Sequence, residues 1–286
     1  SIGYKELVGI LQSGVGSNVI LDLKLTGDTA DRKALITRKL GQHFLGSPLA
    51  TAISLGYEKR KRKNERLLLS ALTNPAHITP WLNIMLAHHV PLLGIYSVPN
   101  ISAPLIKDNL SEHVLLLSWE KHAGLRQTYF DAGLLRFSRL TPVVAGSSFS
   151  EQVATEAVRT QQYLKSLSLI PVGRALDVYI ICHAGDRREL EARLGGSPDI
   201  HYAYLDIQEL GQRIKLKAAF NDSDTTLLLL HLLAARMQHS NYAATEHTHY
   251  YQLLQLRRRL RWLNTALVAS CVLWSAANMW EGSWLN

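Results

Sequence analysis

The stretch HVLLLSWEKHAGLRQTYFDAGLLRFSRLTPV, residues 113–143, decides the fold. It holds three strand-like runs, at 113–119, 125–132 and 134–143, which are separated by two short turns that contain glycine. Consecutive strands joined by turns this short pair as an antiparallel meander. The stretch therefore predicts three neighbouring strands of one sheet.

Helices and strands alternate after this meander. Ser148 and Glu151 have the spacing of a capping box, which predicts a helix from there to about Leu167. A strand at 177–184 follows, and Asp222 or Ser223 is the predicted cap of a last helix. The remaining predicted elements are a helix at 186–194, a strand at 201–207 and the body of that last helix at 225–237. A meander followed by alternating helices and strands resembles the half-domain plan of actin-like ATPase folds.

The residues before the meander predict a strand at 66–72, a helix at 76–89 and a strand at 92–98. Such a unit usually has parallel strands joined by a right-handed crossover. We place a domain boundary near residue 110. Residues 1–110 are then a first actin-like half that lacks its N-terminal part, and residues 111–240 are the second half.

Three runs resemble the pilus-assembly protein PilM. The run at 70–99 is similar to its hinge segment, and the run at 148–167 is similar to its long helix. Residues 177–194 match the position of its adenosine-contacting strand, loop and helix. FDAGLLRFSRLTP, residues 130–142, is typical of assembly-platform relatives. The resemblance covers about residues 60–280.

A membrane segment after such a domain resembles the L component of type II secretion and the pilus protein MshI. The resemblance implies an α/β, actin-like (ribonuclease H-like) domain of two halves, followed by one transmembrane helix. It also implies other pilus or secretion assembly proteins as partners, at the bacterial inner membrane.

The predicted membrane segment is WLNTALVASCVLWSAANMW, residues 262–280, which carries no formal charge. As a helix it would cover about 28 Å, close to the hydrocarbon thickness of a bilayer. A juxtamembrane helix at 241–261 precedes it. The side chains expected to anchor the chain are Arg257, Arg258, Arg259, Trp262, Trp274 and Trp280.

The basic residues before the span predict a single pass with the N-terminal domain in the cytoplasm. A buried C-terminal helix is the alternative, because four polar residues make the span only moderately apolar. These residues are Asn264, Ser270, Ser275 and Asn278. The same residues suit contacts between helices, and a homodimer stays open.

Nucleotide chemistry is not expected from the sequence. Phosphate-binding turns of actin-like ATPases use small residues, whereas residues 118–124 here include Trp119 and Lys121 and offer only Gly124. The adenosine position, residues 182–186, keeps one glycine. The sequence therefore predicts no catalytic residue, no metal and no enzyme. ATP binding through Gly124, Gly185 and Asp186 is the weaker alternative.

The net charge of +8 concentrates in a basic run that includes Arg60, Lys61 and Arg62. It predicts an exposed loop, either simply solvated or attracted to anionic lipid or an acidic partner. No aromatic residues interleave with it, so nucleic acid is not expected as a partner. Arg136 and Arg139 are three apart in a strand and should point to opposite faces, one of them paired and one facing a partner protein.

These features together predict an inner-membrane scaffold that connects the proteins of a pilus or secretion machine. The first alternative is a working ATPase of the same fold, whose missing phosphate turn lies near the native N-terminus. The second is a membrane-anchored regulator unrelated to pili. Only two cysteines, Cys182 and Cys271, are present, which excludes a disulfide scaffold.

Overall fold

The structure is a computed structural model, and it describes residues 8–12, 16–24, 29–44, 47–57, 64–72, 75–106, 111–196, 198–235 and 241–284. The chain packs as two compact units. Unit 1 comprises Ser1–Val8, Ile78–Gly94 and Ala243–Asn286, and unit 2 comprises Gly9–His77 and Ile95–Tyr242. The predicted boundary near residue 110 stays a prediction.

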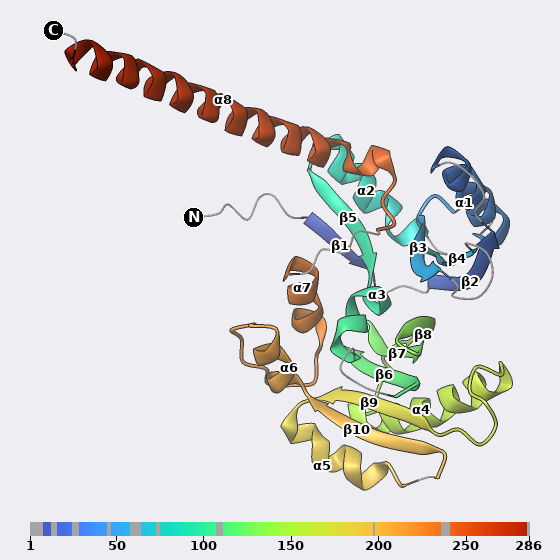
Figure 1. The fold of residues 1–286 in the computed structure, drawn as a ribbon. Coiled ribbons are helices and arrows are strands. Elements are labelled where there is room, and N and C mark those ends of the chain that lie inside the picture. Colours follow the sequence, from blue (N-terminus) through green and yellow to red (C-terminus); the bar gives the residue numbers. More distant parts are fainter. Residues whose placement is uncertain are drawn as a thin grey trace. The chain divides into compact units, whose positions relative to one another are not determined.

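The largest sheet of unit 2 has five strands in the order β10-β9-β6-β7-β8 (Figure 1). Strands β6 (His113–Glu120), β7 (Gly124–Asp131) and β8 (Leu134–Thr141) pair antiparallel, which confirms the predicted meander. Strand β9 (Leu176–Cys182) pairs parallel to β6, and β10 (Ile200–Asp206) pairs parallel to β9. The meander and the two parallel strands therefore share β6 as their central strand.

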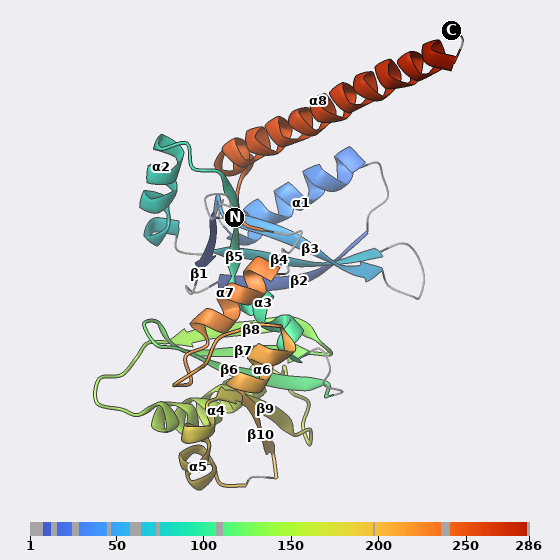
Figure 2. The same cartoon turned by 90° about the vertical axis from the view of Figure 1, so that its left-hand side faces the viewer.

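Helices cover both faces of this sheet because β6 is apolar at every position from Val114 to Leu117. Leu115 and Leu117 pack with residues of α4 (Phe149–Ser166) and α5 (Ala184–Arg193) (Figure 2). Val114 and Leu116 pack with residues of two further helices and of α3, so both faces are buried. The bounds of these helices are Ile207–Arg213 for α6, Thr226–Ala235 for α7 and Val98–Ser102 for α3.

Side-chain caps fix where the helices begin. The Ser148 hydroxyl accepts a hydrogen bond from the Glu151 N–H while the Glu151 carboxylate accepts from the Ser148 N–H, which confirms the predicted capping box. The residue predicted to cap α7 is wrong. Asp224, rather than Asp222 or Ser223, accepts from the Thr226 N–H. Asp222 and Ser223 instead bind neighbouring loops, because the chain turns before the helix starts.

The strand order and directions of the β6–β10 sheet are those of an actin-like half-domain. A three-stranded antiparallel meander supplies β6, and the two following strands extend the sheet in parallel on the other side of β6. Each parallel strand is reached through a helix, α4 or α5, as a crossover connection requires. The fold class predicted from the meander is therefore confirmed for this sheet.

A three-stranded antiparallel sheet lies earlier in unit 2, in the order β2-β4-β3. It comprises β2 (Gly16–Lys24), β3 (Ala50–Tyr57) and β4 (Asn64–Leu72), and α1 (Thr29–Phe44) packs with Leu67 and Leu69 of β4. The bounds of the remaining short elements are Pro75–His77 for η2 and Ala103–Ile106 for η3.

Strand β5 (Leu92–Ser97) forms a separate two-stranded sheet with β1 (Val8–Gln12). β4 and β5 therefore lie in different sheets, and the predicted crossover unit with parallel strands at 66–72 and 92–98 is wrong. Residues 64–72 are already paired on both sides, with β2 and with β3, so neither edge of β4 is open to β5.

Tyr242 joins three distant parts of unit 2. Its buried hydroxyl lies 2.6 Å from the Ser70 hydroxyl and 3.2 Å from the Ser97 hydroxyl, and it accepts a hydrogen bond of 3.2 Å from the Asn100 amide. The Tyr242 N–H donates to the Ile95 carbonyl. Tyr242, the last residue of unit 2, is therefore hydrogen-bonded to β4 and to the β5–α3 connection.

Tyr242→Phe is expected to lower the free energy of unfolding by about 1–3 kcal/mol, because buried polar groups lose their shared hydroxyl. Urea unfolding followed by far-UV circular dichroism measures the change. Tyr163→Phe on α4 is the matched control, since Tyr163 is 43% exposed and the change should stay within about 0.5 kcal/mol. Equal midpoints for the two variants would show that the Tyr242 hydroxyl does not stabilise the fold.

Unit 1 contains α2 (Thr79–Ala87) and α8, one continuous helix over Thr245–Trp284. The predicted separate helices at 241–261 and 262–280 are thus parts of a single helix. The predicted transmembrane helix is not confirmed. Among the helices of the described residues, none combines the length and the apolar character needed to cross a membrane. Asn264, Ser270, Ser275 and Asn278 lower the average hydropathy of 262–280.

Candidate functional site

The candidate site lies where parallel strands β6 and β9 end, at Glu120 and Cys182. Ligands of open α/β sheets bind beyond the carboxyl ends of the strands. Both positions that the sequence assigned to a nucleotide are there: the β6–β7 turn and the start of α5. A third segment, Asp222–Thr225, lies against both of them.

The β6–β7 turn is held by the segment that precedes α7. The Thr225 N–H and hydroxyl both donate to the Trp119 carbonyl, at 2.8 and 2.7 Å. The Lys121 N–H donates to the Asp224 carboxylate at 3.3 Å, and the Lys121 ammonium donates to the Asp222 carboxylate at 3.1 Å. The Lys121 N–H of this turn, which a phosphate would need as a donor, thus binds the chain itself.

Glu120 follows Trp119 and accepts a 2.7 Å hydrogen bond from Arg126 of β7. Both side chains are almost fully buried, with 9% of Glu120 and 2% of Arg126 exposed. A metal bound by this carboxylate would leave the buried guanidinium of Arg126 without its partner. Glu120 is therefore a structural residue of the turn.

The start of α5 is closed by two side chains. The His183 ring accepts a 3.1 Å hydrogen bond from the Gly185 N–H through Nδ1 and so caps the helix. The Ser223 hydroxyl accepts a 2.8 Å bond from the His183 N–H and donates to the Asp186 carboxylate. The N–H groups that the sequence alternative assigned to a nucleotide are therefore bound within the chain.

Gly124, the other weak nucleotide candidate, has a packing role. Its φ is +131°, and a Cβ on this residue would lie 2.0 Å from the carbonyl oxygen of Thr141 on β8. Only glycine fits there. Gly124 lets β7 start in contact with the end of β8, and no phosphate is needed to explain it.

Four carboxylates gather around this edge, and each is hydrogen-bonded within the chain. The pKa of Asp222 is lowered, chiefly by the hydrogen bond from Lys121. No group of three or more metal-ligating side chains occurs among the described residues. The pairs are Glu120 with Arg126, Asp186 with Ser223, Asp222 with Lys121, and Asp224 with Thr226.

Cys182 ends β9 and is buried beneath this edge, with 1% of its surface exposed. Burial raises the pKa of its thiol to about 11. Cysteine reacts as a thiolate, so Cys182 has almost none of its reactive form near neutral pH. Cys182 is therefore a buried packing residue rather than a nucleophile.

Iodoacetamide at pH 8 is expected to modify Cys271, which is exposed, at least about 100-fold faster than Cys182. Mass spectrometry of tryptic peptides measures the two rates. In urea both thiols should react at similar rates, which is the control. Comparable rates in the folded chain would contradict the buried, protonated Cys182.

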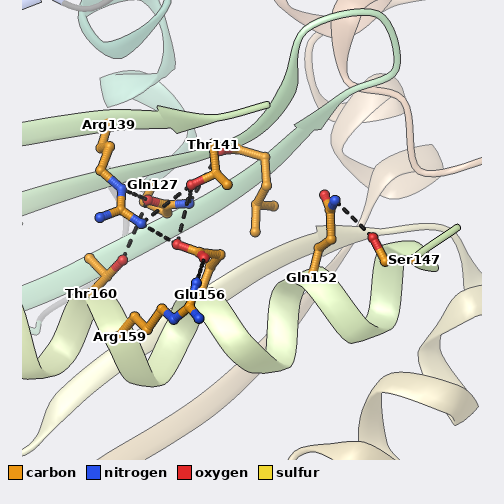
Figure 3. Close-up of polar contacts among 9 residues, drawn as sticks. Gln127, Arg139, Thr141, Ser147, Gln152, Glu156, Arg159 and Thr160 are labelled. Atoms are coloured by element: carbon orange, nitrogen blue, oxygen red, sulfur yellow. Dashed lines mark hydrogen bonds and ion pairs between the residues drawn. The ribbon is translucent and has the colours of Figure 1, made fainter. Parts of the chain in front are cut away.

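Arg136 and Arg139, the predicted partner contacts, are both paired within the chain. Arg136 binds Asp131 at 2.8 Å. Arg139 donates to Gln127 at 3.1 Å and binds the nearly buried Glu156 of α4 (Figure 3). Both keep partial exposure, at 29% and 39% of their side chains. One contact surface for the two together is therefore not evident, and their role toward a partner stays a prediction.

The remaining predicted contact residues fall into two groups. Arg60, Lys61 and Arg62 lie outside the described residues. The other group lies on α8, and all of its members are exposed: Arg257, Arg258, Arg259, Trp262, Trp274 and Trp280. The α8 group belongs to unit 1, whereas the carboxyl ends of β6 and β9 belong to unit 2.

Comparisons with known proteins show similarity of structure alone. No protein-family model matches the chain, and no curated protein matches it. A solved PilM-PilN type IV pilus biogenesis complex is similar at 11% identity and a TM-score of 0.48, over 82% of this chain and 80% of that one. A Bacteroides thetaiotaomicron protein with an actin-like ATPase fold and unknown function is similar at 12% identity and a TM-score of 0.32, over 69% and 67%. Because both scores are low, the fold assignment rests on strand order.

The sequence reasoning missed the segment Asp222–Thr225 as part of this edge. Asp222 and Ser223 were predicted as helix caps. Instead, Asp222 binds Lys121, 101 positions away, and Ser223 binds His183, 40 positions away. The signal was present as three polar residues, Asp-Ser-Asp, directly before a leucine-rich helix. Only tertiary contact shows which loops they bind.

Proposed function

We propose that the chain is a non-catalytic scaffold in a type IV pilus or type II secretion-like machine. Its actin-like domain would bind partner proteins at the bacterial inner membrane. The observation that carries the proposal is the closed edge of the β6–β10 sheet, where Asp224, Ser223 and His183 accept hydrogen bonds from backbone N–H groups that a nucleotide would need.

A working actin-like ATPase must present free N–H groups to phosphates and free carboxylates to Mg²⁺. Here the Lys121 N–H and the Gly185 N–H each have a partner within the chain. A nucleotide would have to displace the Asp224 carboxylate and the His183 ring from these N–H groups. A fold that keeps its framework and loses its ligand groups is suited to binding proteins.

The pilus or secretion setting rests on the resemblance of residues 70–99, 148–167 and 177–194 to PilM. Membrane association is the second part of the proposal. Four arginines of α8 would contact anionic headgroups, each contributing about 1 kcal/mol. Exposed tryptophans at 262, 274 and 280 would sit at the interface.

Calorimetric titration of the 286-residue chain with Mg-ATP tests the non-catalytic part. We expect no saturable heat at micromolar or low millimolar nucleotide, and an active actin-like ATPase titrated in parallel is the positive control. Saturable binding at micromolar ATP that Asp186→Asn removes would overturn the proposal and favour the ATPase alternative.

Co-sedimentation with vesicles of phosphatidylglycerol tests the membrane part. Changing Arg257, Arg258, Arg259 and Arg261 to glutamine should reduce bound protein at least tenfold, because four charges near the surface are lost. Removing four exposed arginines of unit 2 matches the change in net charge and should leave binding unchanged: Arg174, Arg187, Arg188 and Arg193. Equal losses in the two variants would show that binding is not through α8.

A further inference from the structure

Helix α8 carries a row of leucines that the proposed function does not use. Leu253, Leu256, Leu260, Leu263 and Leu267 follow one another at alternating spacings of three and four residues. This is the a/d pattern of a coiled coil, with 253, 260 and 267 at a. All five are exposed, from 40% at Leu253 to 65% at Leu263.

The leucine row faces away from the part of unit 1 that α8 packs against. At the start of α8 the half-buried residues include Tyr251, Leu254 and Gln255, whereas Leu253 and Leu256 are exposed. At 3.6 residues per turn these half-buried positions are b, c and f, on the side opposite a and d. The Tyr250 ring also packs against the ring of His89, which follows α2, with the ring centroids 4.7 Å apart. One side of the helix is therefore used, and the leucine side is open.

We propose that the leucine row binds the same row of a second copy, as a parallel two-stranded coiled coil over residues 253–267. Leucine pairing selects the direction. The parallel arrangement sets each of the five leucines against its own copy, and its flanking g and e positions bring Gln252 near Arg257 and Arg259 near Asn264 of the second copy. An antiparallel arrangement pairs a with d and leaves one leucine unmatched. Centred on residue 258 it also brings Arg257 near Arg257 and Arg259 near Arg259, and centred between residues 261 and 262 it sets Leu253 against Ser270.

The proposal goes beyond the proposed function and needs neither lipid nor an assembly partner. A buried leucine seam is stabilised by removal of apolar surface from water, and each leucine here now exposes two fifths or more of its surface. Two chains would then be joined through α8.

Disulfide trapping in the purified 286-residue chain tests the arrangement, in buffer without lipid. In a Cys271→Ser background, Ser270→Cys places a thiol at the next d position and Ser275→Cys places one at b, outside the seam. We expect the Ser270→Cys variant to form a disulfide dimer at least tenfold faster than the Ser275→Cys variant. In an antiparallel arrangement the two copies of residue 270 would be at least about 25 Å apart, so only the parallel one allows this bond.

Light scattering gives an independent readout of mass. The unchanged chain should have twice the 32.0 kDa of one chain, Leu260→Gln at a should have the mass of one, and Thr265→Gln at f should stay a dimer. A single-chain mass for the unchanged protein, or equal trapping at 270 and 275, would overturn the proposal. A single-chain protein that binds vesicles through the leucine row would assign that row to lipid instead.

Discussion

Replacement of Arg126 by methionine is expected to lower the free energy of unfolding by about 3–5 kcal/mol. Arg126 is fully buried and binds the buried carboxylate of Glu120 at 2.7 Å. Without the guanidinium, a charge would remain in an environment that excludes water. Urea unfolding followed by far-UV circular dichroism measures the change.

Two controls separate this charge effect from simple loss of packing. Arg187→Met removes an arginine whose pair with Glu191 is about half exposed, and it should leave the urea midpoint unchanged. The double variant Glu120→Leu with Arg126→Met removes both charges and should recover most of the lost stability. If the double variant were as unstable as Arg126→Met, the unpaired carboxylate would not be the cause.

Gly124→Ala should have the second large effect and lower the free energy of unfolding by about 3 kcal/mol or more. The residue has a φ of +131°, which costs an alanine about 1–3 kcal/mol, and the added Cβ would lie 2.0 Å from the Thr141 carbonyl oxygen. The overlap adds a further loss of about 1–3 kcal/mol. The β6–β7 turn or the end of β8 must move to accommodate the methyl group.

Gly133→Ala is the matched control for this clash. Gly133 also has a positive φ, of +76°, in the next turn of the same meander, but a Cβ there would meet nothing within 4 Å. The free energy of unfolding of Gly133→Ala should therefore fall only by the cost of backbone strain, about 1–2 kcal/mol. Thermal unfolding of both variants gives the comparison. Equal losses would show that the close approach to Thr141 does not matter.

The meander and the helices around it were predictable because their signals are local. Strand-like runs joined by short glycine turns predicted β6, β7 and β8, and the Ser148–Glu151 box predicted the start of α4. The crossover unit of β4, α2 and β5 was predicted wrongly. Its basis was the order of elements, and order does not tell which strand occupies an edge that β2 and β3 already fill.

The residues that close the candidate site were not predictable from the sequence. Trp119 and Lys121 in the β6–β7 turn already argued against a phosphate turn. The role of Ser223 and Asp224 could not be foreseen, because Asp224 lies 103 residues from the Lys121 N–H that it binds. Hydrogen bonds over such separations depend on where the sheet places each loop.

The sequence by itself determined the local structure of this protein. Apolar periodicity, glycine turns and capping residues act within a few positions, and they specify the five-stranded sheet, its helices and the leucine row of α8. Only the tertiary structure decided that the carboxyl ends of β6 and β9 are closed and that the leucines of α8 face away from the rest of unit 1. Both facts depend on which distant groups satisfy buried hydrogen bonds and cover apolar surface, and these partners are fixed only when the whole chain has packed.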